Sequence, residues 1–243
     1  MKNFLISLAL LLQPNFSKDE TRKSYYEDLI HSKSDSGVKN AVNSSLVIHS
    51  IGITGQLAMG SGNLLKIHGN EVVLTAYHVV KGGISFAAAE KDNSLTELSL
   101  IYFDENKDIA VLKPKSKLLI TSAIKVKLKE DNLVGKEVYH CGHPSVIKFN
   151  LSRGIITSYS WGFLIIDSFS LPGSSGSVVF GPDGDVVGVV VAMATGYWSD
   201  PPELIDKVIL ISPISEDDIL KITKSVKENK QKYLTNVLKH VIL

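Results

Sequence analysis

Short apolar runs separated by turn-forming residues dominate the chain from about residue 45 to residue 213. The runs are rich in Val, Ile, Leu and Thr, whereas Gly, Asn, Asp and Pro lie between them. This pattern predicts many short β-strands with tight connections, as in a sandwich or a barrel. Two of the connections, His68–Asn70 and Gly181–Asp185, carry specific hairpin-turn signals. The expected strands cover residues 46–48, 62–67, 72–75, 98–103, 109–112, 138–141, 154–157, 163–166, 177–180, 186–193 and 208–211.

The last thirty residues follow a helical period instead. Ser215 and Asp218 stand three positions apart, as in a helix-capping sequence. Ile219, Ile222 and Val226 then recur at helical spacing, with several lysines between them. A basic amphipathic helix sometimes binds membranes, but a solvated lysine face is the more common arrangement and is our expectation here. The sequence therefore predicts a helix over residues 214–243.

The amino-terminal region has a different character. A positive start is followed by nine apolar or small residues, 4–12, which is too short for a membrane span of about 20 residues. The pattern favours a signal peptide over residues 1–16, and hence export to the periplasm or outside the cell, although no clear cleavage site follows. Residues 17–42 are polar and charged, which is typical of a leader or linker. No other stretch is long and apolar enough for a stable membrane span.

Composition narrows the classes of partner. The chain has 243 residues, of which 44% are hydrophobic, enough for one large core or two small ones. A net charge of +1 and 7% aromatic residues give no reason to expect a nucleic-acid partner. The single cysteine, Cys141, excludes an intramolecular disulfide, and its strand-like surroundings favour a buried apolar role over a nucleophilic one.

One Gly/Ser-rich segment, Leu171–Ser177, has the composition of a nucleophile loop. Acyl transfer requires a nucleophile whose neighbouring backbone amides point at the developing oxyanion. Gly173 permits a tight turn, and Gly176 permits close approach of backbone to substrate. We therefore expect Ser175 to be the nucleophile and the amides of Gly173 and Ser175 to form the oxyanion hole. Taken alone, such a cluster is also compatible with an ordinary loop.

Two further residues supply the groups that a serine nucleophile needs. His78 follows the apolar strand that ends near Ala76, and an imidazole is the natural base for a hydroxyl. Asp108 opens a fully apolar strand, where a carboxylate must be exposed, capped or paired with a donor. Its functional role would be to accept the second His78 N–H and so fix the tautomer. A buried histidine and a turn aspartate are the structural alternatives.

Together the three segments resemble a known family. Thr75–Val80 resembles the T-A-x-H-V/C segment of trypsin-like serine proteases, Asp108–Leu112 resembles their D-I-A-L-L segment, and Gly173–Ser177 resembles their G-[DN]-S-G-G segment. The chain order His, Asp, Ser is the chymotrypsin order. The resemblance implies an all-β, chymotrypsin-like double six-stranded β-barrel and a triad of Ser175, His78 and Asp108. Its two barrels would span residues 43–122 and 123–213.

Further segments are most similar to bacterial high-temperature-requirement proteases and small viral relatives. They are Gly60–Gly62, Gly142–Pro144, Ser152–Thr157 and Gly188–Val191, so that the resemblance extends over roughly residues 45–213. Two positions depart from the family pattern: Ser174 replaces the usual Asp or Asn, and Ser177 replaces the second Gly. The thirty residues after the last barrel strand are too few for a PDZ domain, so the regulation and oligomeric state of those proteases are not carried over.

The resemblance implies a serine endopeptidase that acts on polypeptides through an acyl-enzyme and needs neither a metal nor another cofactor. In this family the primary specificity pocket is walled by residues that correspond to Phe169, Val191, Ala192 and Met193. Because none of the four is charged, we expect a preference for small or medium apolar residues at the cleaved position.

Three other functions remain open at this point. The first is a binding module that keeps the protease fold without activity, although all three triad positions are filled. The second is a metal hydrolase that uses His140, Cys141 and His143, although no further pair completes a tetrahedral set. The third is an esterase or other acyl-transfer enzyme that uses the same triad.

Overall fold

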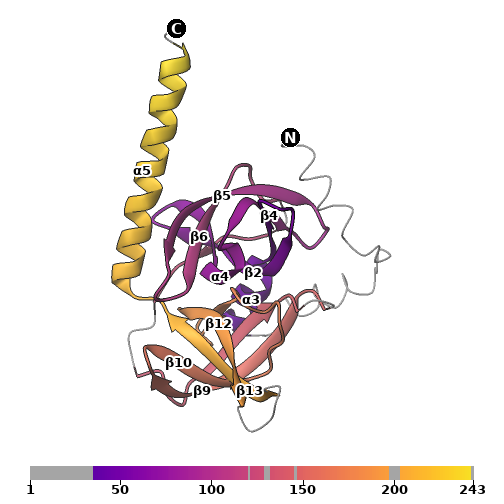
Figure 1. The fold of residues 1–243 in the computed structure, drawn as a ribbon. Helices are drawn as coiled ribbons and strands as arrows, with labels where there is room; N and C mark the ends of the chain where they lie inside the picture. Colours follow the sequence, from indigo (N-terminus) through magenta and orange to yellow (C-terminus); the bar gives the residue numbers. More distant parts are fainter. Residues whose placement is uncertain (1–34, 120, 129–131, 145–146, 197–202, 242–243) are drawn as a thin grey trace.

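Two β-barrels pack against each other, and a long helix runs beside the first of them (Figure 1). The structure is a computed structural model that describes residues 35–241 apart from 120, 129–131, 145–146 and 197–202. The expected signal peptide over residues 1–16 and most of the expected leader lie outside the described residues.

The first barrel is built from six antiparallel strands in the order β1-β4-β5-β6-β3-β2, and pairing of β1 with β2 closes it. A short strand, β7 (Ile124–Lys125), adds to β2 in parallel. The six barrel strands are β1 (Ser45–Gly52), β2 (Leu57–Ile67), β3 (Asn70–Ala76), β4 (Gly83–Ala89), β5 (Leu95–Asp104) and β6 (Ile109–Pro114).

The second barrel is also closed, in the order β10-β13-β12-β11-β8-β9. This architecture confirms the double six-stranded barrel that the sequence predicts. The strands of the second barrel are β8 (Glu137–Gly142), β9 (Asn150–Ser160), β10 (Phe163–Ser168), β11 (Val178–Phe180), β12 (Val186–Gly196) and β13 (Glu203–Pro213).

Burial of the apolar runs explains why these segments pair as strands. Every predicted run overlaps an observed strand, and side chains such as Leu74 and Leu112 are fully buried in the first barrel. Ile166 and Ile211 are fully buried in the second barrel. The sequence pattern does not predict strand β4, because this strand contains one Gly and three Ala residues, which have low strand propensity.

A helix occupies part of the segment that composition assigns to a linker. Helix α3 (Ser36–Ser44) buries Ala41 and Val42, and the N–H of Gly37 donates to Pro182 O at 3.0 Å. Residues 36–42 therefore belong to the folded body rather than to the linker. The segment is polar in composition but has one short apolar face, and packing of this face against both barrels stabilises the helix.

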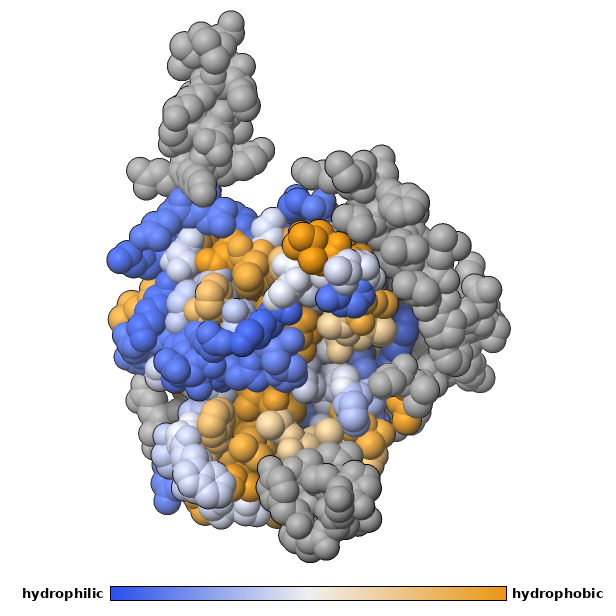
Figure 2. Space-filling model, in the orientation of Figure 1, coloured by the Kyte–Doolittle hydropathy of each residue, from blue (hydrophilic) through white to orange (hydrophobic). Residues whose placement is uncertain are grey.

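The carboxyl-terminal helix is present as expected. Helix α5 (Glu216–Val241) buries Ile222 and Val226 near β5 and then extends beyond the first barrel (Figure 1). Within the described part of the chain, no helix has both the length and the apolar character needed to cross a membrane. The face drawn in Figure 2 is mixed, with a hydrophilic band across the first barrel and hydrophobic residues gathered beneath this band.

Candidate active site

His78 and Asp108 form a hydrogen-bonded pair. His78 lies in the single-turn helix α4 (Tyr77–Val80), which follows β3 directly, and Asp108 immediately precedes β6. The His78 Nδ1–H donates to Asp108 Oδ2 at 2.6 Å, and the His78 backbone N–H donates to Asp108 Oδ1 at 2.8 Å. This arrangement fixes the tautomer that leaves Nε2 free to accept a proton.

The backbone of Asp108 has an unusual conformation. Its φ of 52° lies in the left-handed region, which a non-glycine residue adopts only when its surroundings enforce it. The Tyr77 N–H donates to Asp108 O at 3.0 Å, and the Tyr77 ring stacks on Phe103 with 4.6 Å between centroids. The start of α4 and the β5–β6 turn are thereby joined, and the carboxylate is aimed at the His78 ring.

The loop that carries Ser175 has two glycines with positive φ, Gly173 at 103° and Gly176 at 92°. A Cβ on Gly176 would lie 2.1 Å from Ser61 O and 2.3 Å from Thr75 Oγ1, so only glycine fits there. The Gly176 N–H donates to Val190 O at 2.7 Å, which ties the loop to β12. Ser175 itself is partly accessible to solvent.

The backbone of Ser175 meets the first barrel next to His78. The Ser61 N–H donates to Ser175 O at 2.8 Å. A Cβ on Gly60 would lie 3.0 Å from Ser175 O and 2.6 Å from a methyl carbon of Val79, the residue after His78. Within the described residues, no hydrogen bond joins the Ser175 hydroxyl to the His78 ring.

The two amides expected to form the oxyanion hole are open. Among the described residues, the N–H groups of Gly173 and Ser175 donate to no backbone acceptor. Ser174 O accepts both the Ser177 N–H at 3.1 Å and the Ser177 hydroxyl at 2.7 Å. Because the peptide group is planar, holding the Ser174 carbonyl also sets the direction of the Ser175 N–H. Ser177, which replaces the usual glycine, thus supports the loop.

Buried polar residues of the first barrel support the Ser175 loop, a role that the sequence patterns did not assign to them. Ser61 is fully buried, and its hydroxyl donates to Gly173 O at 2.7 Å and accepts the His143 N–H at 2.9 Å. The Thr75 hydroxyl donates to Ser61 O at 2.6 Å, and Asn63 Oδ1 accepts the Val178 N–H at 2.8 Å. Polar residues inside apolar strand sequences were the available signal, since buried polar groups need partners.

The residues of the metal-hydrolase alternative have other contacts. His143 Nδ1 accepts the Phe149 N–H at 2.9 Å, so its Nε2–H faces Ser45 Oγ at 2.8 Å. Burial lowers the pKa of His140 to about 4 and raises the pKa of the Cys141 thiol to about 12, which leaves both groups neutral. In the described ranges, no three His, Cys, Asp or Glu side chains cluster so as to hold a metal ion. His140, Cys141 and His143 therefore do not form the ligand set of that alternative.

The expected pocket residues lie on two segments of the second barrel. Phe169 follows β10 and is exposed, whereas Val191, Ala192 and Met193 lie on β12, with Val191 buried and the other two half-buried. Strand β12 is the strand to which Gly176 is bonded through Val190, so these residues continue directly from the Ser175 loop.

The fold and this arrangement of residues define the class of chymotrypsin-like two-barrel proteins. The trypsin-like peptidase domain family matches residues 60–189, a range that contains His78, Asp108 and Ser175. The chain belongs to this family.

Curated relatives are longer proteins that are named proteases. Protease Do-like 1 of the Arabidopsis thaliana chloroplast is 30% identical over 149 residues, covering 55% of this chain and 33% of that protein. A probable periplasmic DegP-like serine endoprotease of Pseudomonas fulva is 32% identical over 142 residues, covering 54% of this chain and 28% of that protein. The matched region is thus about a third or less of each relative.

Solved structures share the fold. The serine endoprotease from Yersinia pestis superposes with a TM-score of 0.59 at 20% identity, covering 80% of this chain and 65% of that one. The HtrA-type protease AlgW, solved with a tripeptide, gives a TM-score of 0.63 at 20% identity, covering 80% and 64%.

Proposed function

We propose that this protein is a serine endopeptidase in which Ser175 is the nucleophile, His78 the general base and Asp108 the residue that orients the base. The observation that carries the proposal is the His78–Asp108 hydrogen bond of 2.6 Å beside a glycine-flanked Ser175. Membership of the trypsin-like peptidase family supports it, and so do the names of the relatives, a protease in one case and a serine endoprotease in the other.

In the first half of the reaction, His78 Nε2 takes the Ser175 hydroxyl proton as Oγ bonds to the scissile carbonyl carbon. The carbonyl oxygen becomes an oxyanion that accepts the N–H groups of Gly173 and Ser175. His78 then gives its proton to the leaving amine, and the acyl-enzyme remains. Water repeats the sequence and releases the acid. The hydrogen bond from Ser175 to His78 forms in the substrate complex, as is common for catalytic contacts.

The substrate is a polypeptide with a small or medium apolar residue at the cleaved position. Phe169, Val191, Ala192 and Met193 would line the pocket and offer no charge for a basic side chain. A peptide library tests this preference, and cleavage mainly after Lys or Arg would contradict it.

The test of the proposed activity compares Ser175→Ala with Ser158→Ala, a serine of the second barrel outside the loop. We expect Ser175→Ala to lower kcat by about 10⁶ and Ser158→Ala to leave it unchanged. A fluorophosphonate should label the parent at Ser175 alone. Cleavage by Ser175→Ala at the parental rate would contradict the mechanism, and a correctly folded parent that neither cleaves nor labels would favour the inactive binding module.

We also propose that the chain is exported, because relatives are named periplasmic and chloroplastic proteases and residues 1–16 have a signal-like sequence. N-terminal sequencing of the protein from its native cells tests this. An intact amino terminus on protein that stays in the cytosol would contradict export.

A further inference from the structure

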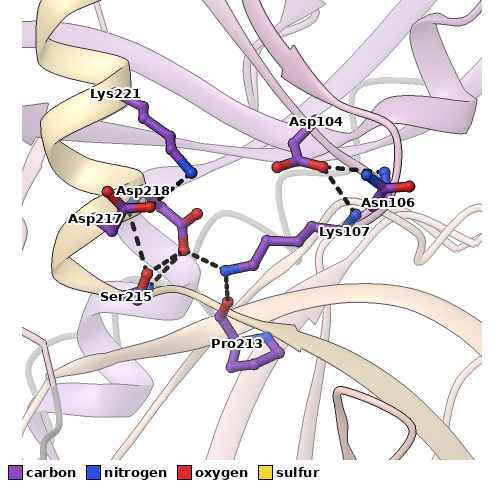
Figure 3. A network of polar contacts seen from close by, with 8 residues as sticks. All are labelled: Asp104, Asn106, Lys107, Pro213, Ser215, Asp217, Asp218 and Lys221. Carbon is purple, nitrogen blue, oxygen red and sulfur yellow. Dashed lines mark hydrogen bonds and ion pairs between the residues drawn. The ribbon is translucent and has the colours of Figure 1, made fainter.

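A charged side chain next to Asp108 reaches across to the second barrel and the long helix. Lys107 Nζ donates to Asp218 Oδ2 at 2.5 Å and to Pro213 O at 3.3 Å (Figure 3). Pro213 is the last residue of β13, and Asp218 lies in the first turn of α5. The β5–β6 turn is therefore tied, one residue away from Asp108, to the end of β13 and the start of α5, which are more than a hundred residues further along the chain.

The far end of this contact is rigid. The Asp218 side chain is 1% exposed, and Oδ2 also accepts the Ser215 N–H at 2.8 Å and the Ser215 hydroxyl at 2.7 Å. Burial by itself raises the pKa of Asp218, but the hydrogen bonds from Lys107 and Ser215 outweigh burial and hold the pKa below its usual value. Asp218 is therefore a fixed, charged anchor for Lys107.

The near end is the turn that places Asp108. Asp104 Oδ1 accepts the N–H groups of Asn106 at 3.0 Å and Lys107 at 3.1 Å (Figure 3). The Asp108 N–H donates to Glu105 O at 3.3 Å, and Asp108 then adopts its left-handed φ of 52°. A strained backbone of this kind persists only where several contacts fix it. Lys107 supplies the contact that extends outside the first barrel.

The placement matters because the proposed triad is divided between the barrels. His78 and Asp108 belong to the first barrel, and Ser175 belongs to the second. Ser61 joins the barrels beneath the Ser175 loop through its contacts with Ser175 O and Gly173 O. Lys107 joins them on the Asp108 side. Asn63 and Ser45 also join the barrels, through the Val178 N–H and the His143 ring. The Lys107 contact adds a connection on the side where Asp108 lies, and contacts at separate points resist rotation of one barrel on the other.

We propose that Lys107 is a positioning residue of the active site, which, through Asp218 and Pro213, holds the His78–Asp108 pair in register with Ser175. This inference rests on the proposed function and makes the first turn of α5 part of the scaffold of the site. A small displacement of a catalytic group is enough to lower the rate strongly.

The experiment uses the full chain with four variants: Lys107→Met, Lys107→Arg, Lys107→Met combined with Asp218→Asn, and Lys115→Met. Lys115 forms an exposed ion pair with Glu97 in the first barrel, so its replacement is a matched control. Each protein is measured for kcat and KM on one peptide, for the rate of fluorophosphonate labelling at Ser175, and for Tm.

We expect Lys107→Met to lower kcat and the labelling rate by about 10-fold with KM within about twofold of the parent. Lys107→Arg should restore most of the rate, and Lys115→Met should behave as the parent. Lys107→Met alone leaves a buried carboxylate without its cation and lowers Tm, whereas adding Asp218→Asn removes that charge and raises Tm again. The labelling rate of the double variant should nevertheless stay low.

Parental kcat in Lys107→Met would overturn the inference. Recovery of the labelling rate together with Tm in the double variant would also overturn it, because Lys107 would then contribute stability alone. A parent that does not label at Ser175 would instead remove the proposed peptidase function, so the two failures are distinguishable.

Discussion

Acidification from pH 7.5 to pH 5 should destabilise this fold strongly, because it buries three histidines in neutral form. His49, His140 and His143 are each at most 3% exposed. Burial lowers the pKa of His49 and of His140 to about 4 and that of His143 to about 3, from an ordinary value of 6.5. The nearby charge of Lys148 adds to the effect of burial on His49 and His143.

The sign and the size of the change in unfolding free energy follow from proton linkage. Below pH 6.5 the unfolded chain binds three protons that the folded chain excludes, so the stability present above that pH is lost as the pH falls toward about 4. At pH 5 each histidine lowers the free energy of unfolding by about 2 kcal/mol, or about 6 kcal/mol for all three. That sum is comparable to the whole stability of many domains, which is about 5–15 kcal/mol. The paired carboxyl of Asp218 loses its contribution only below its ordinary pKa of 3.8, outside this window.

Urea unfolding followed by far-UV circular dichroism at several pH values between 7.5 and 5 measures the effect. Near pH 5 the slope should approach about 4 kcal/mol per pH unit, which corresponds to three protons. His49→Leu removes one of the three histidines and should therefore reduce this slope by about a third. The change breaks no hydrogen bond, because neither nitrogen of the His49 ring has a partner in the described structure. If the slope of the parent corresponds to the uptake of one proton or less on unfolding, the three histidines are not buried in neutral form as proposed.

Three further predictions concern single side chains. Asp108→Asn should lower kcat by about 10⁴ because it disrupts the tautomer of the base, whereas Asp167→Asn, an exposed change on β10, should leave kcat unchanged in the same peptide assay. Gly176→Ala should lower stability by more than about 1 kcal/mol and reduce labelling at Ser175, because its Cβ would clash with Ser61 O; parental urea unfolding would contradict this. Phe180→Ala should cost about 3–5 kcal/mol in urea unfolding at pH 7.5, since the ring is fully buried, and a loss below about 1 kcal/mol would show that the core readily refills the space.

Local sequence determined which segments become strands and where the chemistry-bearing residues stand along the chain. Runs such as Ile109–Leu112 are apolar throughout and fully buried, and polar residues, here Asp108 and Lys113, flank them. His78 and Asp108 were identifiable because His78 follows one apolar run and Asp108 precedes another. In the structure the expected hydrogen bond joins them. These features depend on near neighbours, which the sequence displays directly.

Contacts between distant segments were decided only by the tertiary structure. The sequence does not show that Lys107 meets Asp218, that the buried partner of Ser61 is the Ser175 loop, or that residues 36–42 form a helix against the second barrel. A lysine or serine has many favourable partners in water, and its choice depends on the distance and burial that closure of both barrels creates. Periodicity and motif spacing specify each strand and each reactive side chain, whereas the packing of one barrel on the other specifies how they meet.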